Sequence, residues 1–284
     1  MKRLTVNELY RQGLEMLDYA FIENASFDAR WLIEKAIGID SKQFALKKDK
    51  QVSKKDEVKF LSLIRRRIAG EPLQYILGEW EFMGYPFEVG EGVLIPRPET
   101  ELLVDFAKKT LEGKKNPVVL DLCSGSGCIA ISIAKLFPKA RVIAVELSRE
   151  ACIYLKKNIK LNKVKNVELV MDDIKLPTLL KDVEPDMILS NPPYVRSEDI
   201  FTLQKEVQRE PEMALDGGAD GLDYFRVLST QWFPRLKTGG MMAVECGEGQ
   251  TEDVSQMFAL MHGTTDIIND LSGIPRVVTA IKER

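Results

Sequence analysis

The sequence predicts an α/β protein with a mostly parallel sheet, preceded by a small bundle of helices and a β-hairpin. Residues 1–78 show apolar residues at helical spacing, and residues 79–98 contain two short aromatic runs around a turn. From residue 117, short apolar runs alternate with helical segments, which is typical of a parallel sheet with helices on both faces. We therefore expect a helical domain over 1–78, a hairpin linker over 79–98 and a larger domain over 99–284.

Capping signals divide the N-terminal segment into helices. Thr5 and Glu8 have the spacing of a capping box, and Ser26 and Ser53 are candidate N-caps of two further helices. Gly38 is placed to end the second helix. These signals predict a small helical bundle.

The hairpin is predicted from the alternation of aromatic and polar residues. Trp80 and Phe82 precede a four-residue turn over 83–86, and Phe87 and Val89 follow it. In the larger domain, strands are predicted over 118–122, 142–146, 167–171, 187–190, 241–245 and 277–282, with helices over 129–136 and 150–162.

The composition excludes several classes of site. A formal net charge of −3 lacks the basic surplus that a dedicated nucleic-acid binder usually carries. A single histidine excludes a histidine metal cluster and argues against a Ser-His-Asp triad, and none of the four cysteines forms a C-x-x-C pair. We expect no metal, and the scattered thiols favour a reducing cytoplasm. No apolar run approaches the roughly 18 to 20 residues that a membrane span needs.

A glycine-rich turn follows the first predicted strand and suggests a cofactor site. It carries Cys123, Ser124, Gly125, Ser126 and Gly127, and glycine there lets the backbone approach a ligand closely. The Lys-Ser/Thr pair of a phosphate-binding loop is missing, which disfavours phosphate transfer. The alternative is a tight turn that binds nothing.

Acidic residues end the next two predicted strands. Glu146 can accept hydrogen bonds from both hydroxyls of a ribose, and Asp173, with Ile174 beside it, is placed to meet an adenine. A surface glutamate and a helix N-cap are the alternative interpretations. Together the three strand ends outline an adenosine-shaped site, although nicotinamide cofactors fit the first two signals equally well.

The segment Asn191-Pro192-Pro193-Tyr194 follows the fourth predicted strand and is the most specific signal in the chain. Proline has no N–H, so the segment presents carbonyl acceptors, to which Asn191 adds its side-chain oxygen. Two such acceptors can hold both hydrogens of a planar –NH2 group, aim its nitrogen at a methyl group on sulfur and stabilise the positive charge that develops. Tyr194 offers a face for stacking. The alternative is a simple Asn-Pro turn.

The chain resembles the HemK-type family, the peptide-chain release factor glutamine N(5)-methyltransferases. The likeness covers roughly residues 65 to 280 and extends beyond Asn-Pro-Pro-Tyr, which nucleic-acid amino-methyltransferases share. The other segments that carry it are 70–78, 81–84, 93–101, 210–222, 245–250 and 270–276. Two positions depart from the family's pattern: Cys123 stands where glycine is common, and Glu146 replaces a frequent aspartate.

The resemblance implies a Rossmann-like class I methyltransferase domain, with a mostly parallel seven-stranded sheet and an antiparallel C-terminal strand. It implies S-adenosyl-L-methionine as cofactor, S-adenosyl-L-homocysteine as product, and the glutamine of the Gly-Gly-Gln motif in class 1 release factors as substrate. Residues 123–127, 146, 173, 174 and 191 would contact the cofactor, 191–194 would hold the glutamine, and the helical domain would help to hold the release factor. We expect a monomer that contacts neither nucleic acid nor membrane.

Two other functions stay open at this point. A nucleic-acid methyltransferase would use the same Asn-Pro-Pro-Tyr segment with a flipped base stacked on Tyr194. A non-enzymatic cofactor-binding or scaffold protein would have no need of the acceptors that this segment presents.

Overall fold

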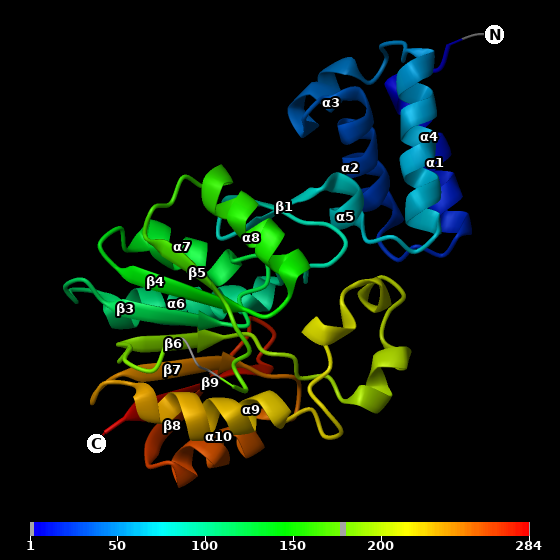
Figure 1. Ribbon diagram of the computed structural model, residues 1–284. Coiled ribbons are helices and arrows are strands. Elements are labelled where there is room, and N and C mark those ends of the chain that lie inside the picture. The colour runs from blue at the N-terminus through cyan, green and yellow to red at the C-terminus, as the bar shows by residue number, and fades with distance from the viewer. Residues whose placement is uncertain (1–2, 177–179, 284) are drawn as a thin grey trace. The chain divides into compact units, whose positions relative to one another are not determined.

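A computed structural model describes residues 3–176 and 180–283, so residues 1–2 and 284 of the predicted domains lie outside the description (Figure 1). The chain forms two compact units. The first comprises Met1–Glu79 together with Lys205–Arg209, and the second comprises Trp80–Gln204 and Glu210–Arg284. The predicted linker over 79–98 therefore falls, apart from Glu79, in the second unit. No helix over the described ranges combines the length and the apolar character needed to cross a membrane.

The first unit is a bundle of helices around one apolar core. Thr5 forms the predicted capping box with Glu8, and Ser53 and Gly38 cap helices as predicted. The prediction for Ser26 is wrong: the helix begins one residue earlier, after Asn24, whose side chain makes no capping bond. The helices are α1 (Val6–Tyr19), α2 (Ala25–Ile37), α3 (Ser41–Lys47), α4 (Lys54–Ile68) and α5 (Leu73–Leu77).

A buried cluster of charges attaches a distant segment to this bundle. Arg67 of α4 donates to Asp28 of α2 at 2.6 Å and to Glu206 at 2.5 Å. Arg67 and Asp28 are both nearly inaccessible to solvent, so each charge depends on its partner. The segment Lys205–Arg209 thus packs with helices that precede it by more than a hundred residues.

The second unit contains a seven-stranded sheet with the strand order β5-β4-β3-β6-β7-β9-β8. Neighbouring strands are parallel from β5 to β7, and β9 is antiparallel to both β7 and β8. This confirms the predicted mostly parallel sheet with an antiparallel C-terminal strand, which is β9. The strands are β3 (Val118–Leu122), β4 (Arg141–Glu146), β5 (Val167–Met171), β6 (Met187–Ser190), β7 (Met241–Glu245), β8 (Gly263–Asn269) and β9 (Pro275–Lys282).

Helices cover both faces of the sheet, because successive residues of each buried strand point to opposite sides. Val119 and Leu120, for example, belong to two different apolar clusters. Figure 1 shows α7 and α8 on one side of the sheet and α9 and α10 on the other. The helices are α6 (Glu101–Leu111), α7 (Cys128–Leu136), α8 (Arg149–Leu161), α9 (Asp223–Val227) and α10 (Thr251–Leu260), with a short 3-10 helix, η1 (Pro98–Thr100), before α6.

The hairpin has a shorter turn than predicted. Strands β1 (Glu79–Phe82) and β2 (Tyr85–Glu88) are joined by Met83 and Gly84 alone. Both turn residues have positive φ, at 52° and 74°, a conformation that lets two residues connect twisted strands. The side chain of Asn158 in α8 bonds to the backbone N–H and C=O of Glu88, which fixes β2 to the second unit.

Candidate active site

The register of the parallel strands brings the predicted site residues to one edge of the sheet. Leu122 pairs with Val145 and with Ser190, and Ser190 pairs with Val244. The residues that follow these positions therefore leave the sheet side by side. This is the edge of an open α/β sheet at which ligands bind.

The glycine turn after β3 is held in shape by its own backbone. Cys123, Gly125 and Gly127 all have positive φ, at 62°, 54° and 81°. Gly127 leaves no room for a side chain, since a Cβ would lie 2.8 Å from Leu155 of α8. Ser124 is buried and its hydroxyl donates to the carbonyl of Asp121 at 2.7 Å. The turn is thus closed by local bonds and by contact with one helix.

Glu146 lies across this turn at the end of β4. Its carboxylate accepts the backbone N–H of Gly125 and that of Ser148, each at 2.7 Å. Burial raises the pKa of this carboxyl, and the backbone N–H groups oppose the shift. Each oxygen has a second lone pair, so the carboxylate can still accept hydrogen bonds from a ligand.

A pocket opens at this edge, with about 650 Å³ of space that is partly continuous with solvent. Its wall is mainly apolar but carries the carboxylates of Glu146, which ends β4, and of Asp172 and Asp173, which follow β5. Among its lining residues are seven predicted positions: Cys123, Gly125, Glu146, Asp173, Ile174, Asn191 and Pro193.

A smaller neighbouring pocket contains two further predicted residues, Ser124 and Ser126. Cys123, Gly125 and Asn191 line both pockets, so the two spaces adjoin. The described linings of these pockets do not include Gly127, Pro192 or Tyr194. Gly127 is instead the N-cap of helix α7, and Pro192, like Pro193, is buried.

The segment Asn191–Tyr194 is held by residues from distant parts of the chain. Asn191 donates from Nδ2 to the hydroxyl of Thr100 at 3.0 Å, and that hydroxyl donates to Glu245 at 2.6 Å. The Gln250 side chain donates to the Tyr194 carbonyl at 3.0 Å. None of these three supporting residues was predicted to act in the site, because each meets the segment only through the fold.

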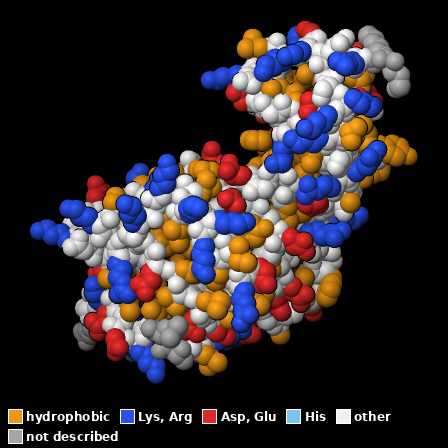
Figure 2. Space-filling model, turned by 45° about the horizontal axis from the view of Figure 1, so that its top comes forward, with side chains coloured by type: hydrophobic (Ala, Val, Ile, Leu, Met, Phe, Trp, Pro, Cys, Tyr) orange, Lys and Arg blue, Asp and Glu red, His pale blue; other side chains and the backbone are white. Residues whose placement is uncertain are grey.

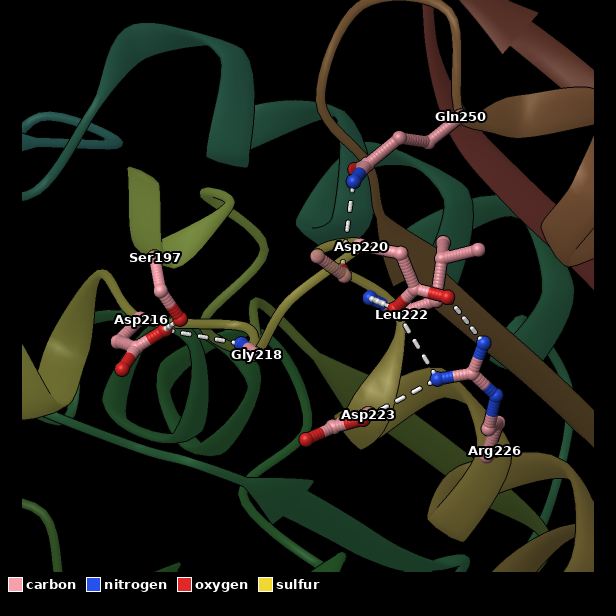
Figure 3. A network of polar contacts seen from close by, with 9 residues as sticks. Ser197, Asp216, Gly218, Asp220, Leu222, Asp223, Arg226 and Gln250 are labelled. Atoms are coloured by element: carbon pink, nitrogen blue, oxygen red, sulfur yellow. Dashed lines mark hydrogen bonds and ion pairs between the residues drawn. The ribbon is translucent and has the colours of Figure 1, made fainter. Parts of the chain in front are cut away.

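The loop over residues 216–223 packs against the backbone of the Asn-Pro-Pro-Tyr segment. Val195 bridges to Asp216, and a Cβ on Gly217 would lie 2.7 Å from the Tyr194 Cα. In Figure 3, Asp216 faces the Ser197 hydroxyl and the N–H of Gly218 at one end of the loop. At its other end Arg226 faces two further aspartates, Asp220 and Asp223 (Figure 3). Gly217 and Gly221 thus let the loop approach the backbone of Pro193 and Tyr194 closely.

Two carboxyl groups beneath the site are kept from water. Burial raises the pKa of Asp121 to about 7, although the N–H of Ala130 and the hydroxyl of Ser124 oppose the shift. Burial likewise raises the pKa of Glu245 to about 7, opposed by the Thr100 hydroxyl. One Asp121 oxygen accepts from Ala130, whereas the other has no hydrogen-bond partner among the described residues. In the part of the chain that is described, no group of three or more His, Cys, Asp or Glu could hold a metal ion.

Two family descriptions match the chain, one in each part. Residues 8–78 match the family described as PrmC N-terminal domain, and residues 98–219 match the family described as methyltransferase small domain. The fold has counterparts among solved methyltransferases. A methyltransferase from Pyrococcus furiosus has a TM-score of 0.53 at 19% identity, covering 72% of this chain and 91% of that one. At this identity the likeness concerns the fold alone.

Curated relatives match over most of the chain. The release factor glutamine methyltransferase of Geobacter sulfurreducens is 40% identical over 260 residues, which cover 90% of this chain and 89% of the relative. The protein of the same name from Thermodesulfovibrio yellowstonii is 40% identical over 228 residues, covering 78% of this chain and 81% of the relative. The chain therefore belongs to the family of release factor glutamine methyltransferases.

Proposed function

We propose that this protein transfers a methyl group from S-adenosyl-L-methionine to the side-chain amide nitrogen of a glutamine, the one in the Gly-Gly-Gln motif of class 1 release factors. One observation carries the proposal: Asn191 and Pro193 line the same pocket as Gly125 and Glu146. An acceptor-rich segment suited to an –NH2 group thus shares a space with a turn suited to an adenosine-containing cofactor.

The lining of the pocket fits the proposed cofactor. Glu146 would accept from the ribose hydroxyls, Asp173 and Ile174 would meet the adenine, and Asn191 with residues 123–127 would contact the remainder. Apolar walls with carboxylates at fixed positions match the flat base and the hydroxyls of adenosine. When bound, the cofactor supplies an electrophilic methyl group on a positively charged sulfur.

The catalytic roles are assigned to Asn191, Pro192 and Tyr194, with Pro193 as a further substrate contact. The Asn191 Oδ1 and the Pro192 carbonyl would each accept one hydrogen of the glutamine amide, which fixes the direction of its nitrogen. These oxygens also stabilise the positive charge that develops on that nitrogen. Tyr194 would stack on the amide plane. No general base is required if the proton leaves after methyl transfer.

The first unit is proposed to hold the release factor. It exposes four aromatic side chains, of which Phe21 is 93% and Tyr19 is 88% accessible. Exposed aromatic residues on a folded unit are typical of protein-binding surfaces. On the face drawn in Figure 2, apolar side chains of the first unit lie among Lys and Arg side chains. Four free cysteines favour the cytoplasm, and we propose that the protein acts there as a monomer.

Mass spectrometry tests this function directly. The protein is incubated with the cofactor and a release factor, and the peptides of the release factor are then analysed. We expect one added methyl group on the Gly-Gly-Gln glutamine, and none when that glutamine is replaced by alanine. Parallel incubations with RNA and DNA and a cofactor labelled in the methyl group test the alternative, and label found only in nucleic acid would overturn the proposal.

A further inference from the structure

A chain of three side chains connects the Asn-Pro-Pro-Tyr segment to the buried end of a neighbouring strand. Asn191 follows β6, Thr100 lies in η1, and Glu245 ends β7. The distances are 3.0 Å from Asn191 Nδ2 to Thr100 Oγ1 and 2.6 Å from Thr100 Oγ1 to Glu245 Oε2. Thr100 and Glu245 are each only 2% exposed, so bulk water does not compete for these bonds.

The donor and acceptor properties of these three side chains give their hydrogen bonds a fixed direction. An ionised carboxylate only accepts, so the single hydroxyl hydrogen of Thr100 must point to Glu245. The Thr100 oxygen is then free only to accept, and within Asn191 only Nδ2 can donate to it. The Asn191 Oδ1 is therefore turned away from Thr100, and no donor among the described residues bonds to it.

We propose that Thr100 and Glu245 are positioning residues that fix the side-chain amide of Asn191 with its oxygen toward the substrate. The inference rests on the proposed function, because it is the –NH2 group of the substrate that requires an acceptor at this place. Without these two hydrogen bonds, the side-chain amide of Asn191 could flip, with little change in shape, and present its N–H donors to the substrate instead. Two donors would then face the two hydrogens of the substrate amide.

Protonation of Glu245 on Oε2, the oxygen that faces Thr100, reverses the direction of these hydrogen bonds. Glu245 then donates its hydrogen to Thr100 Oγ1, and the hydroxyl hydrogen of Thr100 points to Asn191. The Asn191 oxygen must turn toward Thr100 to accept that hydrogen, which leaves Nδ2 facing the substrate. Turnover is thus expected to require ionised Glu245 and to fall as the pH drops through the pKa of this group.

The surroundings of Glu245 place this change near neutral pH. Burial, the largest cause, raises its pKa to about 7, the Thr100 hydroxyl lowers it, and Glu99 raises it further. Arg97 and Arg276 act in the opposite direction. The remaining groups that face it are the Tyr194 hydroxyl, 3.5 Å from Oε1, and the buried thiols of Cys128 and Cys246.

Kinetic measurements on three variants test the inference. Thr100→Val keeps the shape of the side chain and removes the hydroxyl, and we expect kcat for methyl transfer to fall about tenfold or more with a smaller change in KM. Thr100→Ser restores the hydroxyl and should recover most of this loss. Glu245→Gln keeps an acceptor for the Thr100 hydroxyl but removes the titrating group, so its kcat should no longer depend on pH below about 8. Thr110→Val on α6, which removes a hydroxyl bonded only to the Phe106 carbonyl, is the matched control and should keep both constants.

A second readout depends on neither activity nor the identity of the substrate. The side-chain amide of Asn191 is followed by ¹⁵N nuclear magnetic resonance between pH 5.5 and 9, and its signal is assigned by its loss in Asn191→Ala. We expect the signal to shift with a midpoint equal to that of kcat, and to stay constant in Glu245→Gln. A wild-type signal that does not titrate, or a Thr100→Val kcat equal to that of wild type, would overturn the inference. Absence of methyl transfer by the wild type alongside a titrating signal would instead overturn the proposed function.

Discussion

The glycine turn after β3 and the Asn-Pro-Pro-Tyr segment after β6 lie at the same edge of the sheet but are held by different means. The turn is held by its own positive φ angles, by bonds within residues 121–127 and by bonds to the end of the adjacent strand β4. The segment is held by Thr100, Asp216, Glu245 and Gln250, which come from other parts of the chain. Cofactor binding is therefore expected to depend on local sequence, whereas substrate alignment depends on the whole second unit.

The largest effect should come from the segment itself. Asn191→Ala removes one of the two proposed acceptors for the substrate amide, so kcat should fall by roughly 100- to 1,000-fold, or about 2.7 to 4 kcal/mol of barrier. Initial rates at saturating cofactor measure this, and thermal unfolding checks that the variant is folded. An unchanged kcat in a folded variant would refute the role of Asn191.

Substitution of the supporting loop should have the next largest effect. Gly217→Ala places a Cβ 2.7 Å from the Tyr194 Cα and 2.9 Å from the Pro193 carbonyl oxygen, so the segment must move. Small displacements of aligned groups are costly, and we expect kcat to fall about tenfold to a hundredfold. Gly113→Ala is the control, since its φ of 78° makes alanine strained while no atom lies within 4 Å of the added Cβ. The control should lose stability by about 1 kcal/mol and keep its kcat; equal rates in both variants would contradict the support that we assign to the loop.

Changes at the cofactor half should alter affinity more than rate. Glu146→Ala removes the carboxylate proposed to bind the ribose, and the dissociation constant of S-adenosyl-L-homocysteine should rise about tenfold to a hundredfold. Isothermal titration calorimetry measures this. Glu168→Ala on the adjacent strand β5 removes an exposed ion pair with Arg141 and should bind the product as wild type does. Affinity that is equal in both variants would exclude the ribose contact.

The smallest effect is expected at Cys123. Glycine would relieve the strain of the positive φ of 62°. It would also raise the conformational entropy of the unfolded chain and remove a thiol that packs on the apolar cluster, and both effects destabilise the folded protein. Because these effects oppose one another, Cys123→Gly should change the free energy of unfolding by no more than about 1 kcal/mol. Chemical denaturation measures this, and a loss above about 2 kcal/mol would mean that thiol packing outweighs the backbone strain.

The same contrast explains how much the sequence could predict. The alternation of strands and helices and the positions of Glu146, Asp173 and Asn191 at strand ends follow from periodicity, because both are local properties of the chain. The hairpin turn was predicted two residues too long, since nothing in the residues alone indicated that Met83 would adopt a positive φ.

The supporting residues could not be predicted from local patterns. Thr100 and Glu245 are separated by 145 positions and meet because α6, which follows Thr100, packs against β7. Gln250 bonds to the carbonyl of a residue 56 positions earlier. The one available signal was that these residues lie in segments resembling the family, which marked them without assigning a role.

The central claim is that Asn191 and Pro192 hold the two hydrogens of a glutamine amide. A crystal structure with S-adenosyl-L-homocysteine and a release factor tests it most directly. We expect the amide nitrogen of the Gly-Gly-Gln glutamine within hydrogen-bond distance of both the Asn191 Oδ1 and the Pro192 carbonyl oxygen, pointing to the sulfur of the product. A glutamine bound with its carbonyl oxygen toward Asn191, or lying outside the pocket, would contradict it.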